Sequence, residues 1–170
     1  MTTLRKLRHT LSRTPARMPL VWMRHRGFRP TDIFIGSYPR SGSTWLRFML
    51  LEILVGQASS FTNTNEMLPD LGNHEAGAPL LPGGGRVIKT HEPFRAKYRK
   101  AIYLVRDPRD VVLSEFAYQT ALGLTQDDFG IYVERFLKGR VNPFGTWTNH
   151  ATSWMDAADG HRALKHQQRT

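Results

Sequence analysis

The chain lacks cysteine entirely, and it lacks any long uninterrupted apolar stretch. Without cysteine it can form neither a disulfide framework nor a thiolate metal site nor a cysteine nucleophile. The longest apolar run, residues 45–55, contains Arg47 and Glu52. It falls short of the roughly 18–20 residues that a membrane-spanning helix requires. No secretory signal is recognisable either, so we expect a cytoplasmic protein.

Acidic residues are missing from residues 1–30, which hold eight basic ones. The net charge of the whole chain is +10, but the other 140 residues carry 16 basic and 14 acidic residues, or only +2. A basic body that binds nucleic acid does not have this distribution, and no nucleic-acid partner is expected. The arm is typical of a transit peptide, of a surface helix touching anionic lipid, or of a solvated extension. Pro15 and Pro19 are expected to break its helical pattern.

Beyond the arm, strand-like and helix-like segments alternate. Strands are expected at 32–37, 86–90 and 101–106, and helices at 44–55, 107–123, 125–139 and 147–158. The alternation predicts a thin, mostly parallel α/β sheet with helices on both faces. Residues 56–85 form a long connection with a short helix near Glu66, and after residue 158 the pattern dissolves into a polar tail.

The loop after the first expected strand, residues 36–45, is the most informative segment. A glycine-bearing turn into a helix N-terminus directs several backbone N–H groups at one point, which suits a phosphate. Arg40 adds a cation, and Trp45 could stack on a base. Five residues separate Gly36 from Gly42 and no Lys follows, so this is not the NTPase P-loop. A plain turn stays the alternative.

A second anion site is predicted from Arg106, at the end of the third strand, and Ser114 on the next helix. Positions 107, 110, 114, 118 and 121 share one helical face, so Ser114 can face the strand end. Taken alone, Arg106 is as well explained by an ion pair with Asp107 or Asp110.

Lys89 and His91 flank one residue at the carboxyl end of the second strand, where open α/β sheets bind their ligands. Another histidine, His150, lies between two tryptophans and is expected to be packed structure. No metal site is predicted.

Four segments resemble, in order and spacing, signature segments of the sulfotransferases: Ser37–Trp45, Val87–His91, Tyr103–Ser114 and Gly145–Trp154. The resemblance spans residues 31–158. It implies an incomplete three-layer, P-loop-NTPase-like α/β fold with a short parallel sheet flanked by helices. It also implies transfer of a sulfuryl group from 3′-phosphoadenosine-5′-phosphosulfate to a hydroxyl or amine of a small molecule or carbohydrate.

The resemblance further implies roles for individual residues. The donor's 5′-phosphosulfate and adenine would be bound by Arg40, Ser41, Gly42, Ser43, Thr44 and Trp45. Arg106 and Ser114 would hold the 3′-phosphate. His91 would be the general base, with a pKa near the working pH, and Lys89 would stabilise charge on the transferring group. Arg40 would take part in catalysis together with His91 and Lys89.

Two positions depart from the family pattern. Arg40 stands where the cytosolic small-molecule members usually carry Lys. Glu92 replaces an apolar residue, and its charge is expected to raise the pKa of His91. Nothing after Trp154 resembles the family's later segments, so we expect a truncated product in which residues 159–170 are an unmatched tail.

Two other classes of function stay open. A small nucleotide kinase is disfavoured because no Lys follows Gly42. A nonenzymatic remnant that binds nucleotide or a membrane surface through residues 1–30 is the main alternative to an enzyme. The sequence indicates neither the acceptor nor the oligomeric state.

Overall fold

The structure, a computed structural model, describes residues 14, 17–160 and 163–167, with side chains as far as residue 158. Four parallel strands pair in the order β2-β1-β3-β4: β1 (Ile33–Ser37), β2 (Val87–Thr90), β3 (Ala101–Val105) and β4 (Ala163–Gln167). The helices are α2 (Met18–Arg24), α3 (Ser43–Val55), α4 (Phe61–Met67), η2 (His74–Ala76), α5 (Pro108–Ala121), α6 (Phe129–Leu137) and α7 (Trp147–Gly160).

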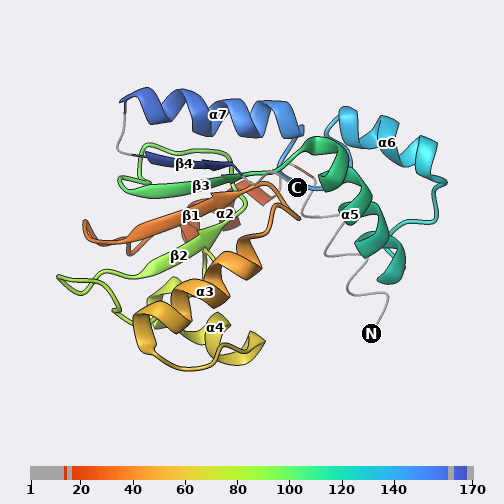
Figure 1. Cartoon of the computed structure of the whole chain (residues 1–170). Coiled ribbons are helices and arrows are strands. Elements are labelled where there is room, and N and C mark those ends of the chain that lie inside the picture. Colours follow the sequence, from red (N-terminus) through yellow and green to blue (C-terminus); the bar gives the residue numbers. More distant parts are fainter. Residues whose placement is uncertain (1–13, 15–16, 161–162, 168–170) are drawn as a thin grey trace.

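The sheet is covered on both faces. Figure 1 shows α7 on one side and α3 with α4 on the other, while α5 and α6 lie beyond the carboxyl ends of the strands. Alternate strand residues supply the two cores, as the pleat requires. One core joins Phe34, Ile88, Tyr103 and Trp154, and the other joins Ile35, Val87, Leu104 and Leu51. The expected three-layer α/β arrangement is confirmed.

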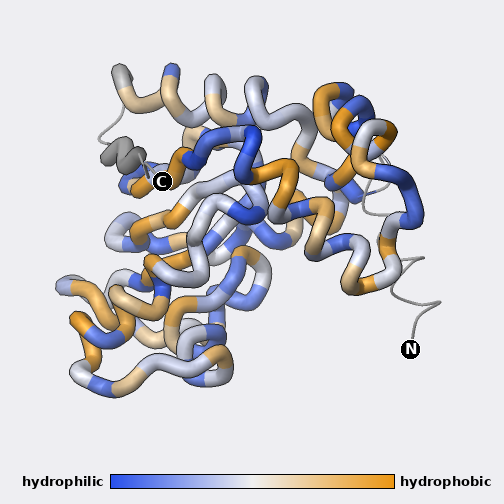
Figure 2. Tube along the Cα trace, turned by 45° about the vertical axis from the view of Figure 1, so that its right-hand side comes forward, coloured by the Kyte–Doolittle hydropathy of each residue, from blue (hydrophilic) through white to orange (hydrophobic). Residues whose placement is uncertain are grey.

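A third apolar cluster joins α5 and α6 beyond the sheet, centred on Tyr38, Val111 and Tyr132. Along α6, at the upper right of Figure 2, the tube alternates between hydrophobic and hydrophilic residues, as expected for a helix with one buried face. Both helices begin at acidic caps, since Asp107 accepts from the backbone N–H of Arg109 and Asp128 from that of Ile131.

Gly36 has a packing role. Its face of β1 lies under Trp154, and a Cβ atom there would come within 2.3 Å of the indole ring. That ring is fully buried and stacks on Tyr103, with centroids 5.1 Å apart. The sequence groups Gly36 with the anion-binding loop, but the structure requires it for close contact with α7.

One sequence-based expectation is wrong. Three strands are expected, yet β4 pairs in parallel with β3 within residues 159–170, where no regular structure is predicted. Pairing through backbone groups at a strand edge requires no apolar pattern, which explains why the sequence gives no indication of it. Pro19 lies in the first turn of α2, where its missing N–H is not needed. The leucine pattern of residues 4–11 lies outside the described residues.

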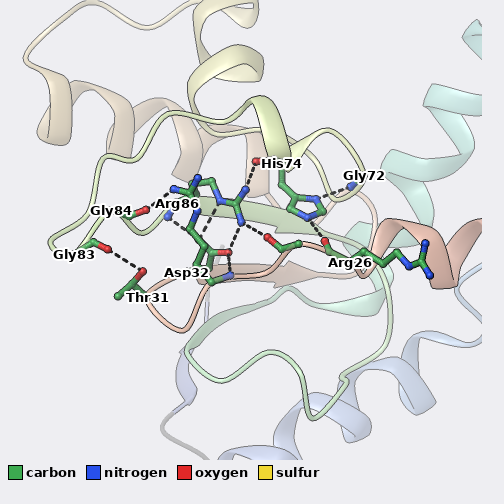
Figure 3. A network of polar contacts seen from close by, with 10 residues as sticks. Arg26, Thr31, Asp32, Gly72, His74, Gly83, Gly84 and Arg86 are labelled. Atoms are coloured by element: carbon green, nitrogen blue, oxygen red, sulfur yellow. Dashed lines mark hydrogen bonds and ion pairs between the residues drawn. The ribbon is translucent and has the colours of Figure 1, made fainter.

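A buried ion pair fixes the amino ends of β1 and β2 (Figure 3). Arg86 Nη2 lies 2.7 Å from Asp32 Oδ2, and the two side chains are only 2% and 0% exposed. The guanidinium also donates to the carbonyls of His74 and Gly27, at 2.8 and 2.7 Å. Burial raises the pKa of Asp32, but hydrogen bonds from Arg86 and the Arg29 N–H outweigh it, and the net pKa is lowered.

None of the described helices is long and apolar enough to cross a membrane.

Candidate functional site

A cavity of about 730 Å³ lies at the carboxyl ends of the strands. Nine of the ten predicted site residues line it: Arg40, Gly42, Ser43, Thr44, Trp45, Lys89, His91, Arg106 and Ser114. Ser41, the tenth, is buried in the same loop. Parallel strands end at one edge of the sheet, so segments far apart in sequence meet there.

The loop between β1 and α3 offers hydrogen-bond donors to this cavity. Gly42 has φ +94°, a left-handed conformation that favours glycine, and it immediately precedes α3. No side chain caps α3, so the N–H groups of its first turn stay available. Ser41 Oγ is buried without a hydrogen-bond partner among the described residues. A buried donor of this kind fits an anion at the loop.

Arg40 lies beside the second predicted anion site. Its Nε donates to Ser114 Oγ at 3.0 Å, and its guanidinium lies 4.7 Å from the centre of the Tyr118 ring. Its φ is +66°, which is unusual for a residue with a side chain. The side chain is thus in contact with Ser114, one of the two residues predicted to hold the 3′-phosphate.

Arg106 combines the two interpretations that the sequence leaves open. Its Nη1 donates to the Arg40 carbonyl at 3.2 Å, and its Nε lies 3.6 Å from Asp110 Oδ2. Asp107 pairs with Arg109 instead. Because the Arg106 side chain is still 30% exposed, it retains donors that can reach an anion in the cavity.

Lys89 is held by an acidic residue that sequence reasoning missed. Its Nζ lies 3.2 Å from Asp70 Oδ1, and the buried Arg47 lies 3.3 Å from the same oxygen. Asp70 is placed there because residues 69–71 pair with the backbone of Lys89 along the outer edge of β2. Burial lowers the pKa of Lys89, and Asp70 opposes this. Asp70 lies in a loop with no pattern to predict its partner.

His91 has a defined tautomer. Its Nδ1 lies 2.7 Å from the carbonyl oxygen of Ser37, which can only accept, so we assign the proton to Nδ1. In the neutral ring, Nε2 is then the free base. Burial, followed by the charge of Lys89, lowers the pKa of His91 to about 3. The expected pKa near the working pH is therefore wrong.

The expected effect of Glu92 on His91 is also not found. Glu92 is buried, and its carboxylate pairs with Arg17, which also donates to the carbonyl of Pro143. The Arg17 guanidinium lies 5.4 Å from the centre of the Phe144 ring, itself 5.7 Å from the His91 ring. A residue of the basic arm therefore neutralises Glu92 and holds a wall of the cavity.

His150 is packed structure, as expected. It is 1% exposed, donates from Nε2 to the His91 carbonyl at 2.9 Å, and accepts at Nδ1 from the Tyr103 hydroxyl at 3.0 Å. Burial lowers the pKa of His150 to about 4. Within the part of the chain that the structure describes, no group of three or more metal-ligating side chains is found.

Other residues complete the cavity wall: Pro39, Phe48, Phe61, Glu115, Tyr118, Gln119, Leu124, Asn142, Pro143 and Phe144. Tyr118 follows Ser114 by one helical turn, so the helical face identified in the sequence could have indicated it. Residues 142–144 reach the cavity from an irregular segment after α6, so no helical or strand periodicity in the sequence indicates them.

Comparison with known proteins decides the family. The family profile described as Sulfotransferase domain matches residues 30–166. The chain belongs to the sulfotransferase family. Among its relatives, Sulfotransferase 2A6 of Rattus norvegicus is 31% identical over 140 residues, which cover 73% of this chain and 48% of the relative. Sulfotransferase 1E1 of Rattus norvegicus is 29% identical over 154 residues, covering 80% and 52%.

Solved structures support the sulfotransferase fold. Mouse sulfotransferase SULT7A1 complexed with PAP superposes with a TM-score of 0.66 at 23% identity, covering 94% of this chain and 58% of that one. Retinol dehydratase in complex with androsterone and inactive cofactor PAP gives a TM-score of 0.63 at 21% identity, covering 85% and 56%. The chain spans about half the length of the curated relatives it matches.

Proposed function

We propose that this sulfotransferase chain transfers a sulfuryl group from 3′-phosphoadenosine-5′-phosphosulfate to a hydroxyl or amine. The observation that carries the proposal is the single cavity that nine predicted site residues share. A site for a doubly phosphorylated nucleotide needs two separate groups of anion-binding donors, and the cavity has both.

The first group would bind the 5′-phosphosulfate. It consists of the first-turn N–H groups of α3, the left-handed turn at Gly42 and the buried hydroxyl of Ser41. The dipole of a 13-residue helix adds partial positive charge at this point. Trp45, 71% exposed at the cavity wall, offers a ring against which adenine can stack.

The second group would bind the 3′-phosphate. Arg40, which the family resemblance assigns to the 5′-phosphosulfate, instead donates to Ser114, and Arg106 donates to the Arg40 carbonyl. Two guanidinium groups with one hydroxyl suit a phosphate dianion. Asp110, the present partner of Arg106, would compete only weakly with a phosphate, because the Arg106–Asp110 ion pair is 3.6 Å long and partly exposed.

His91 would accept the acceptor's proton at Nε2 as the acceptor oxygen attacks sulfur. The bond between sulfur and the 5′-phosphate oxygen would break, and 3′-phosphoadenosine-5′-phosphate would leave with that electron pair. Its Nδ1–H bond to Ser37 keeps the ring oriented. Burial and the charge of Lys89 lower the pKa of His91. Negative charge from the donor raises a nearby pKa, so we expect His91 to become a stronger base once donor is bound. Lys89 would stabilise charge on the transferring group.

The acceptor would be a small molecule or a carbohydrate. Aromatic side chains line one part of the cavity: Trp45, Phe48 and Phe61 form edge-to-face contacts at 6.3 and 5.1 Å. Glu115, Gln119 and Asn142 add polar groups elsewhere in the lining. The cavity can therefore take an acceptor with an apolar body and a hydroxyl group.

Calorimetric titration with 3′-phosphoadenosine-5′-phosphate, with 5′-AMP as the comparison ligand, tests the proposal. We expect the 3′-phosphate to improve affinity at least about tenfold, and Arg106→Ala to remove most of that gain. Arg109→Ala is the matched control, because its side chain is 88% exposed and does not line the cavity. A folded protein that binds both nucleotides equally, or neither, would support a nonenzymatic remnant instead.

A further inference from the structure

Helix α2 presents one face to the protein and the other to solvent. Val21 and His25, spaced by four residues, form the inner face and are 3% and 4% exposed. The His25 ring bonds to the Val21 carbonyl and to the Tyr98 hydroxyl, both at 2.6 Å. Arg17, four residues before Val21, also points inward and pairs with Glu92. These contacts fix which side of α2 faces outward.

The outward side is strongly apolar. Four large side chains are about half exposed or more: Met18 at 52%, Leu20 at 47%, Trp22 at 63% and Met23 at 54%. Single exposed apolar residues are ordinary on protein surfaces, but four within two helical turns form a patch that indicates an interaction.

Positive charge flanks the C-terminal end of this patch. Arg24, Arg26 and Arg29 lie at or just after the end of α2, and residues 1–30 contain no acid. The Arg26 guanidinium lies 4.9 Å over the Trp22 ring. An apolar face with tryptophan, flanked by arginines, matches the chemistry of an anionic lipid surface. A second copy of this chain fits less well, because two such basic arms would repel one another.

We propose that α2 binds the surface of an anionic membrane, with Trp22 and Met23 among the lipid headgroups and Arg24 and Arg26 facing lipid phosphates. The proposal does not depend on sulfuryl transfer, because α2 contributes no residue to the cavity lining. It gives the basic arm a role that the catalytic residues do not explain.

Cosedimentation of the full chain with phosphatidylcholine vesicles, with and without phosphatidylserine, tests this proposal. We expect binding only with phosphatidylserine, and we expect this binding to weaken as salt is added.

The double variant Arg24→Gln/Arg26→Gln should bind about tenfold more weakly or worse and show less salt dependence. Trp22→Ser/Met23→Ser should lose binding while keeping the wild-type unfolding transition. Matched controls are Lys138→Gln, with a 59% exposed side chain, and Ile53→Ser, at 77%. Both should bind like the wild type.

Tryptophan fluorescence provides a second measurement. Vesicle binding should shift emission to shorter wavelength, and Trp22→Phe should keep binding but remove the shift. Absence of binding to phosphatidylserine vesicles would overturn the proposal, as would equal losses in the controls. Dimers without lipid that Trp22→Ser/Met23→Ser dissociates would assign the face to a second copy instead. Unchanged nucleotide binding by the α2 variants would separate this result from the outcome for the catalytic proposal.

Discussion

Arginine side chains lie at both ends of the parallel sheet, but their burial and hydrogen bonding differ. At the amino end, Arg86 is 2% exposed, and all three guanidinium nitrogens donate to protein oxygens of Asp32, His74 and Gly27. At the carboxyl end, Arg106 is partly exposed beside a cavity, with a long ion pair and one carbonyl contact.

The difference separates a structural cation from one that we propose binds a ligand. A buried guanidinium whose three nitrogens all donate to the protein has little left to offer a ligand, whereas removing its partner is costly. A cation with spare donors beside a cavity costs little to keep and can bind an anion. We therefore expect substitutions at the amino end to change stability and those at the carboxyl end to change nucleotide binding.

Removing the acid at the amino end should have the largest effect. Asp32→Ala leaves the Arg86 charge buried and unpaired, so we expect a loss of about 3–5 kcal/mol in the free energy of unfolding. Urea denaturation measures it. Arg106→Ala, the counterpart at the carboxyl end, should cost less than about 1 kcal/mol. Similar losses in both variants would contradict the contrast between the two ends.

Filling the space between β1 and α7 should have the next largest effect. Gly36→Ala places a methyl group against the buried Trp154 ring, with no room to accommodate it. We expect a loss of about 1–3 kcal/mol, measured in the same denaturation experiment. Gly130→Ala is the control, because its nearest atom would be 3.3 Å away in a helix. Equal stability of Gly36→Ala and wild type would show that α7 can move away.

The sequence was informative where backbone periodicity and motif spacing determine position. Arg40, Lys89, Arg106 and Ser114 meet because parallel strands end at one edge. It was uninformative where a contact joins distant irregular segments. Asp70 reaches Lys89 from a loop without regular structure, and β4 pairs with β3 in a segment where the sequence predicts no strand. The low pKa of His91 depends on burial, which follows only from the packed tertiary structure.

Low pH should destabilise the protein through two buried histidines, His91 and His150. The pKa values of His91 and His150 are lowered to about 3 and about 4, so the unfolded chain binds more protons below pH 6.5. Stability should therefore fall as pH decreases from about 6.5 to 4, by up to about 1.4 kcal/mol per pH unit for each histidine. Burial raises the pKa of Glu115, and this shift opposes the fall in stability.

Urea denaturation at several pH values tests the window. His150→Asn should reduce the slope by about one proton, because the substituted chain no longer takes up that proton on unfolding. Asp32 has the opposite shift: its pKa is lowered, so its contribution is present above about pH 3.8 and lost only below it. A slope that His150→Asn leaves unchanged would mean that other groups cause the acid sensitivity.

The smallest expected effect concerns Arg17, which connects the basic arm to the cavity. Its guanidinium neutralises Glu92, the residue after His91. Arg17→Gln leaves that carboxylate without its cation, so the pKa of His91 should rise, by up to about one pH unit. The other charged or titratable groups near His91 are Lys89, Asp70 and His150, and the substitution alters none of them.

Nuclear magnetic resonance can follow this change without any assay of activity. The imidazole signals of His91, assigned with His91→Gln, are titrated downward from neutral pH. In Arg17→Gln they should begin to shift at a higher pH than in the wild type. Adding Glu92→Gln should restore the original curve, because the unpaired charge is then gone. If the double variant still behaves like Arg17→Gln, the arm acts on His91 through the Pro143–Phe144 wall and not through the charge of Glu92.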